Sequence, residues 1–355
     1  MSSAGVTRLK EILGRRCGAF RRELRGDPPA KVQPLKVTLK PGAQPVKAKA
    51  RVSSPAKATW LTGCMAALVA MGMVVRTIQA VCASPAMAVP KPGRAGGFCF
   101  MSDYSRANLQ CEKVPNVVPN QEAQMSMLKG AKCFGKPDLL QGYWQKPLAE
   151  SAREIFTIVT PEGLITPKRV PQGVLKATGY FQALMTEFLQ GSNCIVWVDD
   201  VVWWGIDEIG LLTTLDEIPR RLEDKGIFAA AHKCLFVNTK IKWCGKVYSG
   251  GQVAHDPARL QGLADLRRPE TAGELMQFLQ AVNWLRKSLP RLAEVVEALR
   301  RLLEENMASA PRRTKRIASN RAIKSEAWTA GMAEAWTSAQ DLVAHAVALS
   351  HPKEG

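Results

Sequence analysis

The sequence predicts a mixed α+β fold with two or three subdomains. Its 355 residues are enough for that number of subdomains with a substantial core, and 46% of them are apolar or aromatic. Between 194 and 204, nine apolar or aromatic residues surround Asp199 and Asp200, a pattern typical of a buried β-hairpin whose tight turn carries the acids. Amphipathic patterns over 207–225 and 271–306 predict helices. Strand and helix signals thus occur together in one chain.

The paired carboxylates need an explanation, because folding alone does not require them. Two adjacent aspartates at the tip of an apolar hairpin repel each other and have lost part of their hydration, so a cation normally compensates them. Mg²⁺ takes oxygen ligands and accepts one or two protein carboxylates. On the residues of this hairpin alone, a solvated Asp199-Asp200 turn stays open as the alternative to a metal site.

The charge balance favours a polyanionic partner. Lys and Arg number 49 against 31 Asp and Glu, which gives a net charge of +18 and a sequence pI near 9.7. Basic tails would give the same total, so the charge says little about chemistry. The nine cysteines form no CxxC pair and no Cys/His spacing typical of zinc. Free thiols in a reducing compartment fit best, in agreement with the lack of a signal-peptide pattern.

Two upstream segments complete a pattern with the acid hairpin. Asp138 is followed five positions later by Tyr143, and Pro171-Gln172-Gly173 then leads into a helix-like run. In this order and spacing, these segments and the hairpin resemble the palm of reverse transcriptases from gypsy-type long-terminal-repeat retrotransposons, and more distantly that of retroviruses. An isolated Asp-Asp pair is weak evidence, whereas the ordered set is strong.

The resemblance continues on both sides of the palm. Residues 83–91 and 102–108 are similar to the fingers of that family, and 268–286 is similar to the start of its thumb. The similarity runs from about Asp27 to the early 300s. It implies a right-hand polymerase fold with fingers, a palm built as a ferredoxin-like antiparallel sheet with helices on one face, and a helical thumb. The family's ribonuclease H domain is expected to be lacking.

The resemblance and the composition together predict five regions. Residues 1–57 carry many basic residues, and five prolines stand between positions 28 and 45, so the beginning of the chain is expected to be largely extended. A polyanion-binding arm and a solvated leader both stay open for it. The predicted regions are a partly disordered basic N-terminal arm (1–52), fingers (53–131), palm with a fingers hairpin near 154–170 (132–255), a thumb divided by Pro290 (256–310), and a basic linker with the start of a connection region (311–355).

The resemblance implies an RNA-directed DNA polymerase, a nucleotidyltransferase that extends a primer on an RNA or DNA template from dNTPs. Asp138, Asp199 and Asp200 would be the catalytic residues and would hold two Mg²⁺ ions, with Mn²⁺ as a substitute. Tyr143 would clash with a 2′-hydroxyl and so select deoxynucleotides. The implied nucleotide-binding residues are Lys91, Arg94, Arg106, Tyr143 and Gln172, and the implied nucleic-acid-binding residues are Lys233, Trp243, Gly245, Arg286 and Lys287.

Three departures from the family pattern leave an alternative open. Cys99 stands where many relatives have arginine, and Pro137 precedes the first acid. Within the fingers segment, Ser105 follows Asp103-Tyr104 and precedes Arg106. A cysteine cannot neutralise a triphosphate, and proline is unexpected in a central strand. The alternative is a catalytically decayed, retroelement-derived nucleic-acid-binding protein.

The uncharged run 58–75 also has two interpretations. Its glycines and threonines, and the helix start at Ser54-Pro55, favour a fingers helix over a membrane tether, so we expect no membrane partner. A cytoplasmic location, including virus-like particles, or a nuclear one is expected, and a homodimer is left open.

Overall fold

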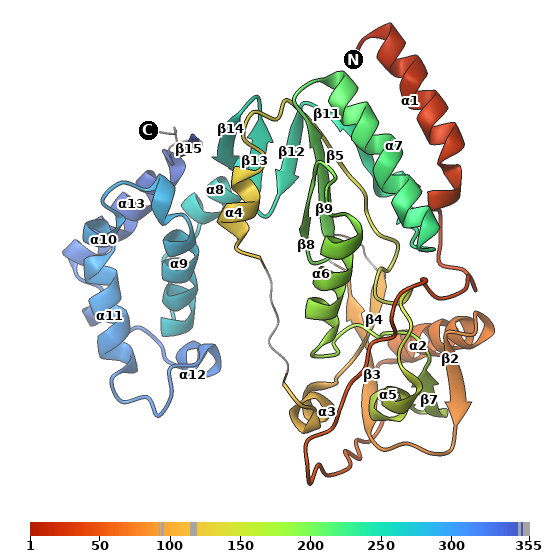
Figure 1. The fold of residues 1–355 in the computed structure, drawn as a ribbon. Helices are drawn as coiled ribbons and strands as arrows, with labels where there is room; N and C mark the ends of the chain where they lie inside the picture. Colours follow the sequence, from red (N-terminus) through yellow and green to blue (C-terminus); the bar gives the residue numbers. More distant parts are fainter. Residues whose placement is uncertain (92, 94–95, 114–118, 347–348, 351–355) are drawn as a thin grey trace. The chain divides into compact units, whose positions relative to one another are not determined.

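The computed structural model describes residues 1–91, 93, 96–113, 119–346 and 349–350, and the chain divides into two compact units (Figure 1). The first unit is Met1–Asn238 and the second is Thr239–Gly355. Each unit has its own sheet and its own hydrophobic core. The predicted palm range, 132–255, includes residues of both units.

The first unit contains a four-stranded antiparallel sheet in the order β11-β5-β9-β8. Its strands are β5 (Cys133–Lys136), β8 (Cys194–Trp197), β9 (Asp200–Gly205) and β11 (Leu235–Asn238). Helices α6 (Ala177–Phe188) and α7 (Glu208–Asp224) share one core with side chains of these strands, among them Phe181, Leu215 and Trp203. The mixed α+β class is therefore confirmed, with helices packed on a face of an antiparallel sheet.

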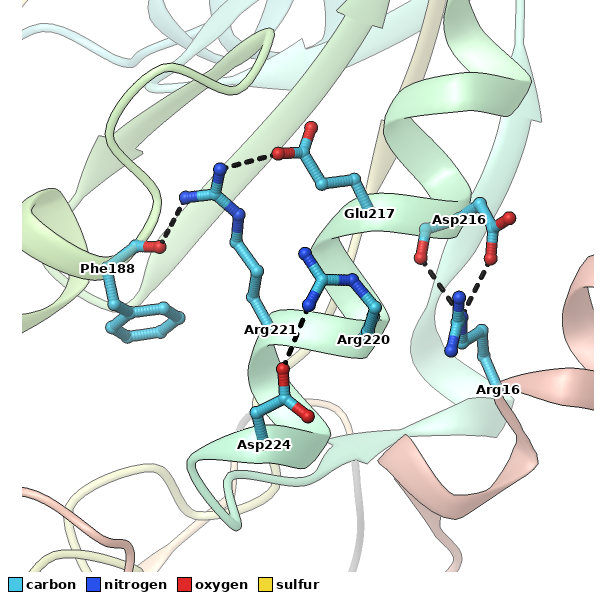
Figure 2. A network of polar contacts seen from close by, with 7 residues as sticks. All are labelled: Arg16, Phe188, Asp216, Glu217, Arg220, Arg221 and Asp224. Carbon is cyan, nitrogen blue, oxygen red and sulfur yellow. Dashed lines mark hydrogen bonds and ion pairs between the residues drawn. The ribbon is translucent and has the colours of Figure 1, made fainter.

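The N-terminal residues pack against this layer. Helix α1 (Ser3–Arg15) lies along α7 and buries Ile12 in the core of the sheet and its helices (Figure 1). Figure 2 shows Arg16 paired with Asp216 of α7, with Nε 2.7 Å from Oδ1. After a 3₁₀ turn (Cys17–Ala19), the two-residue strand β1 (Phe20–Arg21) runs parallel to β10 (Ala229–Ala230). The arm that was expected to be partly disordered thus has defined contacts here.

Helix α7 also holds the end of α6. Arg221 donates from Nη1 to the backbone oxygen of Phe188 at 2.7 Å and from Nη2 to Glu217 at 2.6 Å (Figure 2). Its Nη1 also donates to the backbone oxygen of Gln190 at 3.0 Å. Because α6 leads directly to β8, these bonds fix the loop that enters the acid-bearing hairpin.

A second sheet in the same unit has five strands in the order β2-β7-β6-β3-β4. Neighbouring strands are antiparallel except for the parallel pair β3 and β6. Helix α2 (Pro55–Ala70) packs on this sheet through Leu61, Met65 and Leu68, so the uncharged run is a fingers-type helix. Across the described residues, no helix combines the length and the apolar composition needed to cross a bilayer. The strands are β2 (Val74–Thr77), β3 (Ala83–Pro90), β4 (Phe98–Ser102), β6 (Thr157–Thr160) and β7 (Gly163–Pro167), and the short helices of this part are α3 (Ser105–Gln110), α4 (Gln121–Ser126), α5 (Glu150–Arg153) and the 3₁₀ turn Glu154–Phe156.

The second unit joins a small antiparallel sheet to helices. Its core centres on Phe278 and Trp336, whose ring centroids are 4.2 Å apart. The last long helix, which was predicted beyond the thumb, therefore shares the core of the thumb-like helices. The elements are β12 (Lys240–Trp243), β13 (Lys246–Ser249), β14 (Gln252–His255), β15 (Leu349–Ser350), α8 (Pro257–Ala264), α9 (Ala272–Trp284), α10 (Leu292–Val295), α11 (Glu297–Met307), α12 (Lys315–Ser319) and α13 (Ala330–Ala344), with 3₁₀ turns at Arg286–Ser288 and Ser325–Ala327.

Candidate active site

The acid hairpin closes with a two-residue turn. Trp197 pairs with Asp200, which leaves Val198 and Asp199 as the turn residues between β8 and β9. Val198 has φ 57°, and a β-branched residue in the left-handed region is a genuine outlier that costs about 1–2 kcal/mol. Such strain persists only where the surroundings hold it, and it is found most often at functional sites.

A buried side chain from α6 holds this turn. Gln182 is 2% exposed and accepts a hydrogen bond at Oε1 from the backbone amide of Val198 at 2.6 Å. Its Nε2 donates to the carbonyl oxygen of Val196 at 3.1 Å and to Thr186 at 2.9 Å. One glutamine thus bonds both sides of the strained position and ties the acid turn to the helix behind it.

The structure brings Asp138 beside the acid hairpin. Strand β5 ends at Lys136, and after Pro137 the antiparallel pairing with β9 resumes as a bridge between Asp138 and Asp200. The carbonyl oxygen of Asp138 also accepts the amide of Ala230 at 2.7 Å. Proline therefore stands just outside the strand, where its missing N–H interrupts no ladder bond within β5.

Two lysines face these acids. Lys136 Nζ is 2.6 Å from Oδ1 of Asp200, and Lys233 Nζ is 3.7 Å from Oδ1 of Asp138. All four side chains are partly exposed, so each pair adds little to stability. Within the described ranges, no three His, Cys, Asp or Glu side chains are grouped closely enough to hold a metal. The carboxylates nevertheless match the oxygen donors that Mg²⁺ prefers, and the lysine contacts show that cations are accepted at this place.

Tyr143 lies beside the acids on a packed floor. Its ring stacks at an angle on Phe181 with 5.2 Å between the centroids, and the side chain is half-buried. Burial raises the pKa of the Tyr143 hydroxyl, and the charge of Asp199 acts in the same direction. The phenol is therefore a neutral group at physiological pH and sits within the electrostatic reach of the acid turn.

The predicted nucleotide-binding residues of the fingers are linked to the Pro-Gln-Gly turn. Asn108 of α3 donates from Nδ2 to the carbonyl oxygen of Gly173 at 2.9 Å, and its Oδ1 accepts the amide of Leu175 at 3.0 Å. Gln172 and Arg106 are exposed next to this link. Lys91 is exposed as well, at the end of β3, and the predicted Arg94 lies outside the described residues.

The nucleic-acid-binding residues predicted in the second unit have unlike surroundings. Arg286 and Lys287 are exposed in the turn after α9. Gly245, with φ 75°, forms the turn between β12 and β13. Trp243 is only 1% exposed and packs on Tyr248, so its ring does not offer a surface to a ligand; any role it has is to hold the hairpin. The family resemblance had implied it as a contact residue, and a strand pattern alone does not tell an exposed indole from a buried one.

Exposed Trp284 was not among the predicted residues. It is 43% exposed, and the guanidinium of Arg259 lies 5.2 Å from its ring centroid. The sequence signal that could have identified Trp284 is its position just before the basic residues Arg286 and Lys287. Gln182 could also have been noticed, as a polar residue on the apolar face of a predicted helix.

An antiparallel sheet backed by two helices, with aspartates opposed at the ends of neighbouring strands, is the palm arrangement of nucleic-acid polymerases. Residues 75–247 match the family described as reverse transcriptase (RNA-dependent DNA polymerase). This segment is therefore similar to reverse transcriptase domains.

Curated relatives are retrotransposon polyproteins. The chain is 23% identical over 239 residues to the Transposon Tf2-3 polyprotein of Schizosaccharomyces pombe, which covers 66% of this chain and 18% of that protein. It is 24% identical over 235 residues to the Retrovirus-related Pol polyprotein from transposon opus of Drosophila melanogaster, covering 64% and 23%. The match thus spans less than a quarter of either polyprotein.

Solved structures agree on the fold. The foamy viral protease-reverse transcriptase in complex with dsDNA has a TM-score of 0.82 at 18% identity, covering 99% of this chain and 70% of that chain. The same viral protein in complex with an RNA/DNA hybrid also has a TM-score of 0.82 at 18% identity, covering 98% and 44%. The predicted polymerase fold is confirmed, whereas the gypsy-type assignment and the lack of a ribonuclease H domain stay predictions.

Proposed function

We propose that the chain extends a primer on an RNA or DNA template by transferring nucleotides from dNTPs, with Asp138, Asp199 and Asp200 as the catalytic residues. The observation that carries this proposal is the pairing of Asp138 with Asp200 across β5 and β9, next to a turn that holds Asp199. Carboxylates are the donors that divalent cations use in phosphoryl transfer, and a metal would have to draw these three together, since among the described residues they do not form one cluster.

Two Mg²⁺ ions bound by these acids, or Mn²⁺ in their place, would activate the primer hydroxyl and neutralise the triphosphate. The protein's own part is positioning and charge. Gln182 holds the turn that carries Asp199 through the backbone of Val198, and Tyr143, packed on Phe181, would meet the sugar of an incoming nucleotide. Lys91 and Arg106 would supply exposed cations for the triphosphate, as would Arg94. Gln172 would contact the sugar region of the nucleotide.

Template and primer would be held by contacts to their phosphates and without sequence preference. The net charge of +18 supports this proposal, and Arg286, Lys287 and Lys233 are basic groups for such contacts. The structural neighbours are complexes with dsDNA and with an RNA/DNA hybrid, which favours the same two ligands for this chain. The intracellular compartment and a homodimer stay predictions.

The test is primer extension on an RNA template with Mg²⁺ and all four dNTPs. The parent chain should extend the primer, and the double variant Asp199→Asn/Asp200→Asn should lose at least about 10³-fold in rate, since two of the three proposed metal-binding carboxylates are gone. Asp224→Asn is the matched control, because Asp224 forms an exposed pair with Arg220 at the other end of α7 (Figure 2).

Binding measured beside extension separates this proposal from the decayed alternative. Duplex affinity should fall steeply with salt in the parent and in the double variant alike. A parent that binds duplex and extends no primer with either Mg²⁺ or Mn²⁺ would leave a nucleic-acid-binding protein without polymerase activity.

A further inference from the structure

One buried cation in the floor of the candidate site has no part in the function proposed above. Lys146 has 0% of its surface exposed, although it lies only three residues after Tyr143. Its Nζ donates to the carbonyl oxygen of Gly142 at 2.9 Å and sits 3.1 Å from the centroid of the Phe181 ring. Burial lowers the pKa of Lys146 well below its usual value, with the charge of Asp199 acting against the shift.

A lysine at this position costs stability. An ammonium group that leaves water for an apolar site is compensated here by one hydrogen bond and one aromatic ring. A methionine would fill nearly the same volume and would need no hydrogen bond. Residues that break a packing rule without a gain in stability are candidates for a functional role.

The contacts of Lys146 converge on Tyr143. The carbonyl of Gly142 belongs to the peptide group that precedes Tyr143, and it accepts from Nζ of Lys146. The carbonyl of Tyr143 itself accepts the backbone amide of Lys146 at 3.0 Å. Lys146 therefore bonds both peptide groups that flank the Cα of Tyr143.

The same amine backs the ring of Tyr143. Phe181 is in contact with the Lys146 amine and with the Tyr143 ring, and a Cβ at Gly142 would come within 2.9 Å of Phe181. The Gly142 carbonyl and the side chains of Tyr143, Lys146 and Phe181 therefore form one closely packed floor. A change at Nζ would be transmitted to the Tyr143 ring through the Gly142 carbonyl and through the Phe181 ring.

We infer that Lys146 is a positioning residue that fixes the Tyr143 ring and thereby sets the discrimination between deoxyribonucleotides and ribonucleotides. The inference rests on the proposed polymerase function and on the sugar-selecting place proposed for Tyr143. Discrimination by a steric clash depends on the position of the clashing ring, and small displacements change rates strongly. Lys146 acts only through Tyr143 and touches no substrate.

The test compares Lys146→Met with the parent. Methionine keeps the length and the apolar contact with Phe181 while it removes the bond to Gly142. The ratio of kcat/KM for dCTP to that for CTP should fall about tenfold, mainly because the ribonucleotide reaction improves, and the KM for dCTP should stay within about twofold. The melting temperature should rise. Lys225→Met, at the exposed end of α7, is the control and should change neither quantity.

Nucleotide binding with Ca²⁺ on a primer–template duplex gives a second readout that needs no turnover, and Lys146→Ile repeats the test if the methionine variant does not fold. Lower discrimination together with a higher melting temperature supports the inference. Unchanged discrimination in an active parent overturns it and leaves the polymerase function intact. A parent that neither extends primers nor binds either nucleotide overturns the polymerase function and this inference with it.

Discussion

Two hairpins of the chain close with turns of the same length and different composition. Val198 and Asp199 join β8 to β9, and Cys244 and Gly245 join β12 to β13. In the second turn both residues have positive φ, 47° and 75°, as a type I′ turn requires, and glycine accepts this easily. In the first turn the strained residue is valine.

The difference lies in what holds each turn. In the second turn Gly245 accepts its positive φ because it has no Cβ, whereas the acid turn has the buried Gln182 to keep Val198 in place. A turn that must present acids in one orientation is thus stabilised from outside, by α6. Three predictions test this contrast, and a fourth tests a buried histidine beside the second hairpin; they follow in order of decreasing effect.

Gln182→Leu should have the largest effect. It removes the partners of the Val198 amide and the Val196 carbonyl, so the unfolding free energy should fall by about 2–4 kcal/mol, and primer extension should fall about 100-fold as the acid turn loses its position. Urea unfolding and single-turnover extension measure the two effects. Exposed Gln190→Leu is the control, and equal extension rates for both variants would show that the turn holds itself.

Gly245→Val should destabilise the second hairpin by about 2–3 kcal/mol, because a β-branched residue would have to adopt φ 75°. A Cβ there would also meet Arg259 Nη1 at 2.2 Å and the Trp284 ring at 2.9 Å. Tryptophan fluorescence during urea unfolding measures the loss. Gly262→Val, with open space around its Cβ, is the matched control, and an equally small loss for both would contradict the strain argument.

Val198→Gly should act with the opposite sign. Glycine adopts the left-handed conformation without strain, and this gain outweighs the larger conformational entropy that glycine loses on folding. The unfolding free energy should therefore rise by about 0.5–1 kcal/mol. Primer extension should decline, because the acid turn gains freedom. A variant that is both less stable and fully active would show that the Val198 backbone is neither strained nor needed for activity.

His255→Gln should give the smallest effect, and only at low pH. Burial lowers the pKa of His255, and the charges of Lys246 and Arg259 add to this effect. The unfolded chain therefore binds the proton first, so stability is full above about pH 6.5 and is lost as the pH falls below that value. Between about pH 7.5 and pH 5.5 the melting temperature of the parent should drop more than that of the variant. The control is His232→Gln at an exposed position, whose melting temperature should fall with pH as much as that of the parent.

Local patterns predicted the elements well. The apolar and aromatic residues around Asp199 and Asp200 predicted the hairpin, the periodicity of 207–225 predicted α7, and Ser54-Pro55 marked the start of α2. These features depend on neighbours in the sequence, which is why they could be predicted from it.

Features that depend on distant partners were less accessible. The pairing of Asp138 with Asp200 was expected through the family resemblance and not from periodicity. Lys146 looks like a surface residue in the sequence, because only tertiary packing buries it under Phe181. Helix α1 has apolar residues at helical spacing, but its own sequence does not identify α7 as the helix on which it packs.

The lysines beside the acids have a consequence for handling the protein. Asp138 and Asp200 each have an ammonium group within contact distance, so their mutual repulsion is already offset inside the chain. Assembly of this sheet does not have to wait for a divalent ion, and chelator-treated preparations should keep their native far-ultraviolet circular dichroism. If the acids bind a divalent ion, Lys136 would have to give up its contact with Asp200 in a sheet that is already folded.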